Sequence, residues 1–269
     1  MNIAWFFQDD TFNDEDVSLF KDEVLKQGYT VLSGYDFDPS YSSQYDLIIY
    51  YGSLQLARKI YNKYPNVVIY CTFDNYECTK YYAYLGGYLL NKDYMMIPFS
   101  EFPRMRKLIF SIFGKDGKVF VRPSSGEKTF TGQLVRSLDF DADYKTLNLY
   151  DVSHHAMIII SSPKKIIREW RLVVCDGKVI TGSLYNDATM NLDYKLYPTE
   201  VQDLATQVLA VGYEPDVVWS LDLCETDDGK YHLLEIGGFS CAGMYEGDYD
   251  IIVQDVTEIS CRSYLKNPN

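Results

Sequence analysis

Several features that mark common protein classes are missing from this sequence of 269 residues. The six cysteines include no CxxC pair, and the three histidines (His154, His155 and His232) lack a zinc-ligand spacing, so a structural zinc site is not expected. No apolar run approaches the roughly 20 residues that span a membrane. The N-terminus lacks the basic start and long apolar core of a signal peptide. We therefore expect free thiols in a cytoplasmic protein.

Positive charge is also scarce. The sequence has 25 Lys and Arg against 38 Asp and Glu, which gives a formal net charge of −13. A broad contact with the phosphate backbone of DNA or RNA needs clustered Lys and Arg, so the charge argues against an extended nucleic-acid surface. It leaves room for a local basic pocket that binds a nucleotide. The composition, 47% hydrophobic and 23% charged, is typical of a globular chain with one large domain or two modest ones.

Residues 1–100 alternate between short apolar runs and helical patterns. The runs predict strands at 2–7, 29–32, 45–52 and 66–72, with helices at 14–27, 53–64 and 75–85. Such β-α alternation indicates a parallel sheet covered by helices. No GxGxxG occurs here, so the pattern carries no dinucleotide fingerprint.

After Pro103 the pattern changes to hairpins. A basic amphipathic helix is expected at 102–113 and another helix at 199–212, with hairpin turns at Asp116-Gly117 and Asp176-Gly177. The predicted fold class is thus an α/β unit with a parallel sheet, followed by a larger α+β unit with antiparallel sheets.

The most informative stretch is a hairpin near the C-terminus, at residues 218–245. Asp228-Gly229 suits a two-residue type I′ turn, which pairs Asp227 with Lys230 and sets Asp222 opposite Glu235. Two facing carboxylates repel each other unless a cation or a shared proton lies between them, and oxygen ligands of this kind suit Mg²⁺. The alternative is an exposed acidic pair on a solvated sheet face. The opposite face is expected to supply core residues, namely Leu221, Leu223, Leu234 and Ile236.

Two further segments carry basic residues beside flexible or acidic ones. In VFVRPSSGEKTFTG (119–132), a strand ends at Arg122 and enters a Ser/Gly loop with Lys128, a combination that suits phosphate oxygens, although an exposed hairpin loop is the alternative. The order is not that of a Walker A loop. In the hairpin at Asp176-Gly177, pairing through Cys175 and Lys178 sets Arg171 opposite Gly182 and on one face with Glu169. This pair is either a surface ion pair or an arginine held for a phosphate.

The order of these motifs resembles that of the ATP-grasp superfamily, whose nucleotide lies between two α+β lobes behind an N-terminal α/β lobe. A closer resemblance is to the viral and bacterial subgroup with two Arg and one Lys in the nucleotide site. The matching stretches are VFVRP…K.FTG, IIREWRLVVCDGKVITGSLY and SLDLCETDDGKYHLLEIGGFSCAGMY, within about residues 100–250. The resemblance implies an N-terminal domain at 1–100 and a two-lobed ATP-grasp domain at 101–269.

The resemblance also implies roles for individual residues. ATP phosphates would meet Arg122 and Lys128 under a loop of Ser124, Ser125 and Gly126; adenine would lie against the backbone of Ile159, Ile160 and Ser161; Glu169 and Arg171 would belong to the nucleotide site; and Mg²⁺ would bind Asp222 and Glu235. Catalysis would rest on Arg122, Lys128 and Arg171. Gly237 departs from the Glu-x-Asn pattern of the family and removes one ligand of a second Mg²⁺, for which water or Ser240 would substitute.

The activity implied is that of an ATP-dependent carboxylate–amine (or carboxylate–thiol) ligase, which forms an acyl phosphate and releases ADP and phosphate. Its partners would be a small-molecule or peptide carboxylate and an amine acceptor, with Ser240 and Tyr245 near the acceptor. Its location would be the cytoplasm, that of the host if the source is viral. Two alternatives stay open: a nucleotide-binding regulatory protein without turnover, which Gly237 favours, and a small-molecule kinase on the same fold.

Overall fold

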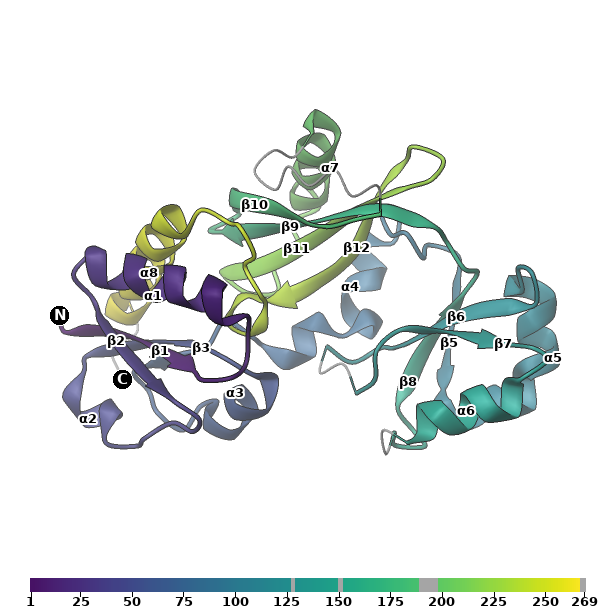
Figure 1. Ribbon diagram of the computed structural model, residues 1–269, viewed down its shortest axis with the longest axis horizontal. Coiled ribbons are helices and arrows are strands. Elements are labelled where there is room, and N and C mark those ends of the chain that lie inside the picture. The colour runs from purple at the N-terminus through teal and green to yellow at the C-terminus, as the bar shows by residue number, and fades with distance from the viewer. Residues whose placement is uncertain (127–128, 150–151, 189–197, 267–269) are drawn as a thin grey trace.

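The computed structural model describes residues 1–126, 129–149, 152–188 and 198–266. These residues form three four-stranded sheets with helices against them (Figure 1). The first sheet is parallel and the other two are antiparallel. The predicted order of a parallel α/β unit followed by antiparallel α+β units is therefore confirmed.

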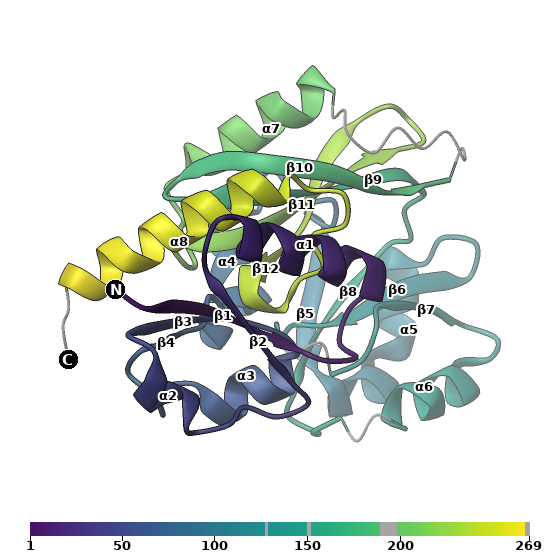
Figure 2. The ribbon, with the colours of Figure 1, turned by 60° about the vertical axis from the view of Figure 1, so that its left-hand side comes forward.

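The N-terminal sheet has the strand order β2 (Thr30–Gly34), β1 (Ile3–Gln8), β3 (Leu47–Tyr51) and β4 (Val67–Val68). Every residue of β3 is buried, as expected for a parallel strand covered on both faces. One face packs against α1 (Asp14–Lys26) and α8 (Tyr249–Lys266), and the other against α2 (Tyr41–Gln44) and α3 (Leu54–Ile60) (Figure 2). The predicted strand at 66–72 is shorter than expected.

The central sheet has the order β10 (Lys178–Asp187), β9 (Ile166–Cys175), β11 (Val218–Thr226) and β12 (Tyr231–Gly238). Its apolar face packs against α4 (Cys78–Leu85) and α7 (Thr199–Leu209) through Trp170, Leu172 and Leu221. Strand alternation therefore turns the side chains of the intervening residues, Arg171 and Asp222 among them, to the opposite face. That face carries the candidate site.

The third sheet has the order β5 (Tyr94–Pro98), β8 (Met157–Ser161), β6 (Lys118–Pro123) and β7 (Gln133–Arg136). Val119 and Val121 of β6 pack with α5 (Phe102–Phe113) and α6 (Phe140–Asn148), which leaves Arg122 on the other face. Three short 3₁₀ helices complete the described elements: η1 (Phe73–Tyr76), η2 (Phe99–Glu101) and η3 (Phe239–Cys241).

Two elements cross the division expected near residue 100. Strand β5 precedes that point and pairs with β8, and helix α8 follows it by far and packs beside α1 on the N-terminal sheet. Among the described residues, no helix combines the length and the apolar character needed to cross a lipid bilayer.

The β11–β12 hairpin has the predicted register at the site but not at its turn. Asp222 faces Glu235, as expected, whereas the loop has three residues, because Thr226 and not Asp227 pairs with Lys230. Gly229 closes this loop with a φ of +72°. A bulge next to Asp222 then shifts the register back by one residue. The two departures cancel at the acidic pair.

The same bulge changes which leucine of β12 enters the core. Leu233 is fully buried in the cluster beneath the central sheet, whereas Leu234, the predicted core residue, is only half-buried. The predicted core positions Leu221, Leu223 and Ile236 are buried. In the β9–β10 hairpin, Lys178 faces Cys175 as predicted, but a bulge between Val179 and Thr181 sets Arg171 opposite Ser183 instead of Gly182.

Candidate functional site

A row of charged residues crosses three neighbouring strands of the central sheet. Arg171 of β9 lies directly opposite Asp222 of β11, which lies directly opposite Glu235 of β12. Residues that face one another across antiparallel strands project from the same side of the sheet. The structure thus brings together three of the predicted site residues on one surface.

Arg171 and Asp222 form a buried two-pronged ion pair. Arg171 Nε donates to Asp222 Oδ1 at 2.8 Å and Nη2 donates to Oδ2 at 2.6 Å, while the third nitrogen, Nη1, donates to the carbonyl of Gly243 at 3.1 Å. The side chains are 11% and 2% exposed. Burial lowers the pKa of Arg171, but the charge and hydrogen bonds of Asp222 outweigh it and raise the pKa overall, so Arg171 stays charged.

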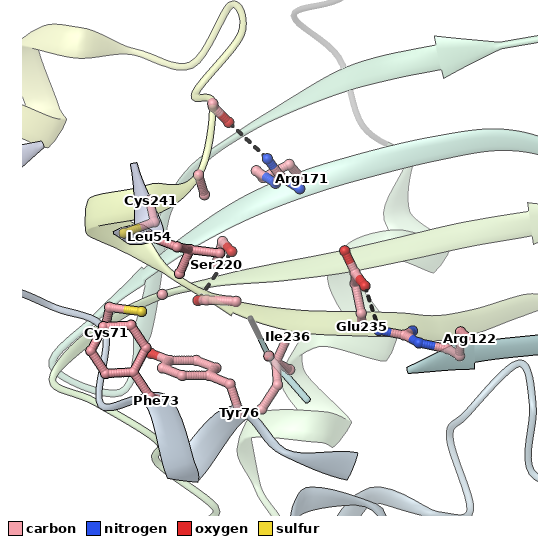
Figure 3. A pocket seen from close by; sticks show the side chains of 15 residues that line it. Leu54, Cys71, Phe73, Tyr76, Arg122, Arg171, Ser220, Glu235, Ile236 and Cys241 are labelled. Atoms are coloured by element: carbon pink, nitrogen blue, oxygen red, sulfur yellow. Dashed lines mark hydrogen bonds and ion pairs between the residues drawn. The ribbon is translucent and has the colours of Figure 1, made fainter. Parts of the chain in front are cut away.

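A second ion pair joins the central sheet to the third sheet. Arg122 Nη2, on β6, donates to Glu235 Oε2 at 2.8 Å, and both side chains are largely buried (Figure 3). The two arginines and two carboxylates together carry no net charge. The site therefore presents two guanidinium groups, from two different sheets, to whatever binds between those sheets.

Two tyrosines that the sequence analysis did not place support Arg171. The rings of Tyr185 and Tyr245 stack with centroids 4.9 Å apart, and the guanidinium carbon of Arg171 lies 5.4 Å from each centroid. The Tyr185 hydroxyl donates to Glu169 Oε2 at 3.0 Å and lies 3.4 Å from Asp222 Oδ2. Asn186 also donates to Glu169, so the predicted nucleotide residue Glu169 is held by two side chains.

The predicted phosphate loop is only partly described. The amide of Ser124 donates to Met157 O at 2.8 Å, and the Ser124 hydroxyl is buried with no hydrogen-bond partner among the described residues. Ser125 is half-buried beside it. A Cβ on Gly126 would come within 2.8 Å of Tyr76 Cβ, so only glycine fits where this loop passes η1. Lys128 lies outside the described residues.

The residues predicted to meet adenine lie in the middle strand of the third sheet. Ile159 faces Arg122 across β6 and β8, but Ile160 points into the core beneath α5, away from Arg122. Because β8 pairs with both β5 and β6, the sheet itself uses the backbone groups of Ile159 to Ser161. A base would therefore contact the side chains here or the backbone that follows.

Two polar residues at the end of β8 were not found from the sequence. Ser161 Oγ donates to Asn91 Oδ1 at 2.9 Å, and Lys164 Nζ donates to the same oxygen at 3.2 Å. Burial lowers the pKa of Lys164. Asn91 lies 70 residues from Ser161, so no local pattern could have indicated this cluster.

A cavity of about 110 Å³ opens beside the ion pairs. Arg122, Arg171 and Glu235 line one part of it, and the remaining lining includes Leu54 and Phe73 from the N-terminal unit (Figure 3). Their approach to the central sheet depends on tertiary packing, so no local sequence pattern indicates them.

The fit of a metal ion depends on the two carboxylates. Among the described residues, no three His, Cys, Asp or Glu side chains converge. Asp222 and Glu235 alone match Mg²⁺, which binds one or two carboxylates together with substrate phosphates and water. A Cβ on Gly237 would lie 2.8 Å from Ser220 Oγ, so an asparagine there would displace Ser220. Ser240 cannot substitute, because its hydroxyl is buried and accepts the amide of Tyr70 at 2.9 Å.

Residues 98–256 match the family model of an ATP-grasp domain, family 3 of one clade of that superfamily. Among solved structures, the chain is similar to D-cycloserine synthetase DcsG, with a TM-score of 0.68 at 12% identity over 96% of this chain and 99% of that one. It is also similar to the D-alanine–D-alanine ligase of Bacillus anthracis complexed with ATP, with a TM-score of 0.66 at 12% identity over 100% of both chains.

A third similar structure is the ATP-grasp ligase PsnB complexed with its minimal precursor, with a TM-score of 0.58 at 11% identity over 96% of this chain and 99% of that one. No curated protein matches the sequence. At these identities the structural likeness establishes the fold.

Proposed function

Because the chain belongs to the ATP-grasp family, we propose that it is an ATP-dependent carboxylate–amine ligase that releases ADP and phosphate. The reaction would pass the γ-phosphate of ATP to a carboxylate, and an amine would then capture the acyl phosphate. Such a reaction depends on holding the reactants in line and neutralising phosphate charge more than on a nucleophile from the protein.

The observation that carries the proposal is the convergence of Arg122 and Arg171, from two sheets, on the facing carboxylates of Asp222 and Glu235. Planar guanidinium groups bind phosphate oxygens with two parallel hydrogen bonds. When Mg²⁺ is bound by the two carboxylates, it would supply positive charge at the phosphate oxygens. The arginines would then exchange their carboxylate partners for phosphates, so that neither set of charges is left unpaired.

The remaining nucleotide contacts belong to the same proposal. Ser124, Ser125, Gly126 and Lys128 would cover the phosphates; Ile159, Ile160 and Ser161 would lie at the base, and Glu169 would bind elsewhere on the nucleotide. Of these, Gly126 has the most direct support, because it lines the same cavity as the two arginines. The buried, unpartnered hydroxyl of Ser124 also supports a polar ligand nearby.

The domain division near residue 100, the viral or bacterial origin and the cytoplasmic location are part of this proposal as well. The amine acceptor would enter near Tyr245, whose ring borders Arg171.

One observation favours the regulatory alternative. Gly237 offers no side-chain oxygen, and Ser220 occupies the space where one would project. A site with two carboxylate ligands holds fewer metal ions than one with three, which would suit nucleotide binding without turnover. The two arginines and both carboxylates favour the ligase, because a protein that only binds a nucleotide has no need of all four.

The test is ADP production from ATP by the wild-type chain and by Glu235→Gln. We expect Mg²⁺-dependent ADP production in the presence of a suitable acid, and its loss in Glu235→Gln, because the amide is a poor Mg²⁺ ligand and carries no charge. Glu258→Gln is the matched control, since that side chain is 64% exposed on α8 and does not line the cavity. Undiminished ADP production by Glu235→Gln would remove this glutamate from the metal site.

A further inference from the structure

The cavity beside the ion pairs has one charged end and one apolar end. Arg122, Arg171 and Glu235 are the only Asp, Glu, Lys, Arg or His residues among the described residues that line it. The opposite wall is formed by Leu54, Cys71, Phe73, Cys241 and Ala242. Figure 3 shows the two groups on opposite sides of the cavity. A ligand that fills it therefore needs an anionic head and an uncharged body.

The apolar wall is held in place by its surroundings. The ring of Phe73 lies edge-on to Tyr61 at 5.6 Å and beneath the guanidinium carbon of Arg58 at 4.7 Å. Cys71 is buried, and a Cβ on Gly238 would come within 2.7 Å of its sulfur. These contacts leave the wall little freedom to retreat from a larger ligand.

The volume of the cavity limits the size of that ligand. A water-sized group needs about 10–15 Å³ on this scale, so a volume of about 110 Å³ accommodates roughly seven to eleven such groups. A transferred phosphoryl group accounts for about four of them. The space left suits an acid of roughly three to seven non-hydrogen atoms.

From the charge, shape and volume of this cavity we infer that the carboxylate substrate is a small acid with an uncharged, apolar body. The inference rests on the proposed ligase function. The carboxylate of the acid faces Arg171 and Arg122, and its body lies against Leu54, Cys71 and Phe73. A second charge on the body would be buried against this wall without a partner, which is costly.

Leu54 is the wall residue most suited to setting this specificity. It is half-buried as the first residue of α3, after Ser53, whose hydroxyl caps the helix by accepting the amide of Leu56 at 3.2 Å. A substitution of Leu54 therefore changes the wall and leaves the cap intact. Leu54→Ala removes three carbons from the wall, and Leu54→Arg adds a positive charge to it.

The experiment measures acid-dependent ADP release with an amine pool, for acids graded in size and charge: propionate, butyrate, alanine, valine, phenylalanine, glutarate and glutamate. For the wild type we expect propionate, butyrate or alanine to exceed phenylalanine and the two diacids by at least tenfold in kcat/KM. Leu54→Ala should narrow the ratio between small and large acids. Leu54→Arg should move the preference towards the diacids.

Leu108→Ala and Leu108→Arg are the matched controls, because Leu108 is an exposed leucine on α5, away from the cavity. Both should keep the wild-type ranking. A wild-type preference for phenylalanine or a diacid would overturn the inference while leaving the ligase function in place. ATP binding without ADP release for any acid would instead overturn the ligase function, and the inference with it.

Discussion

The buried ion pair between Arg171 and Asp222 makes a quantitative prediction for Asp222→Asn. Asp222 is 2% exposed, and both of its carboxylate oxygens accept hydrogen bonds from Arg171. The substitution leaves the size of the side chain nearly unchanged and removes only its charge and one acceptor oxygen. It therefore leaves a buried guanidinium without a counter-charge.

Removal of one partner of a buried ion pair typically costs about 3–5 kcal/mol. The asparagine oxygen can still accept one hydrogen bond, and Gly243 O still accepts another from Arg171, so we expect the low end, about 3 kcal/mol. This is a large share of the roughly 5–15 kcal/mol of a native protein. With a urea slope of about 3 kcal/mol per molar, the unfolding midpoint should fall by about 1 M.

The assay is urea unfolding of both chains, followed by tryptophan fluorescence, without nucleotide or Mg²⁺. The control is Asp227→Asn on the same hairpin, whose side chain is 54% exposed and 3.9 Å from Lys165 Nζ. We expect it to change stability by no more than about 0.5 kcal/mol. A loss below about 1 kcal/mol for Asp222→Asn would refute the view that Arg171 depends on this carboxylate for its charge balance.

Three further predictions concern the ligands and the pH dependence. Arg122→Ala should weaken ATP binding about 10- to 100-fold in calorimetry, because charge-assisted hydrogen bonds are lost, whereas Arg106→Ala on α5 should not; equal affinities would contradict the phosphate role of Arg122. Tyr185→Phe should weaken Mg²⁺ binding to the ATP complex about tenfold, since its hydroxyl contacts Glu169 and lies near Asp222, whereas Tyr245→Phe should keep the wild-type affinity. Burial lowers the pKa of His232 below its ordinary 6.5, so the unfolded chain binds this proton more readily and the contribution of neutral His232 is lost as pH falls through the folded pKa. Stability measured from pH 7 to pH 5 should therefore fall less in His232→Gln than in the wild type, and a slope identical to that of the exposed His155→Gln would count against it.

The central pairing of the site could be predicted from local patterns, although not for the predicted reason alone. The alternation of β11 and β12 places Asp222 and Glu235 on one face whenever they are paired. The turn has one residue more than expected, and the bulge beside Asp222 restores the register. Neither feature has a clear local signal, because the Asp-Gly pair fits a two-residue and a three-residue loop equally well. The error remains visible in the exchange of Leu233 for Leu234 in the core.

Other parts of the site depend on contacts between distant segments. Leu54 and Phe73 reach the cavity from the N-terminal unit, and Asn91 reaches Ser161 from a loop 70 residues away. Arg122 reaches Glu235 across 113 residues, and this contact was indicated only by the resemblance to a family. Periodicity describes the faces of single elements, so it carries no information on which faces meet.

The most direct test of the ligase function is the mass of the product formed from ATP, Mg²⁺ and a pool of small acids and amines. The account predicts ADP, phosphate and a new species whose mass equals that of one acid and one amine minus water. A stable phosphorylated acceptor with ADP, or ATP binding with no product at all, would contradict it.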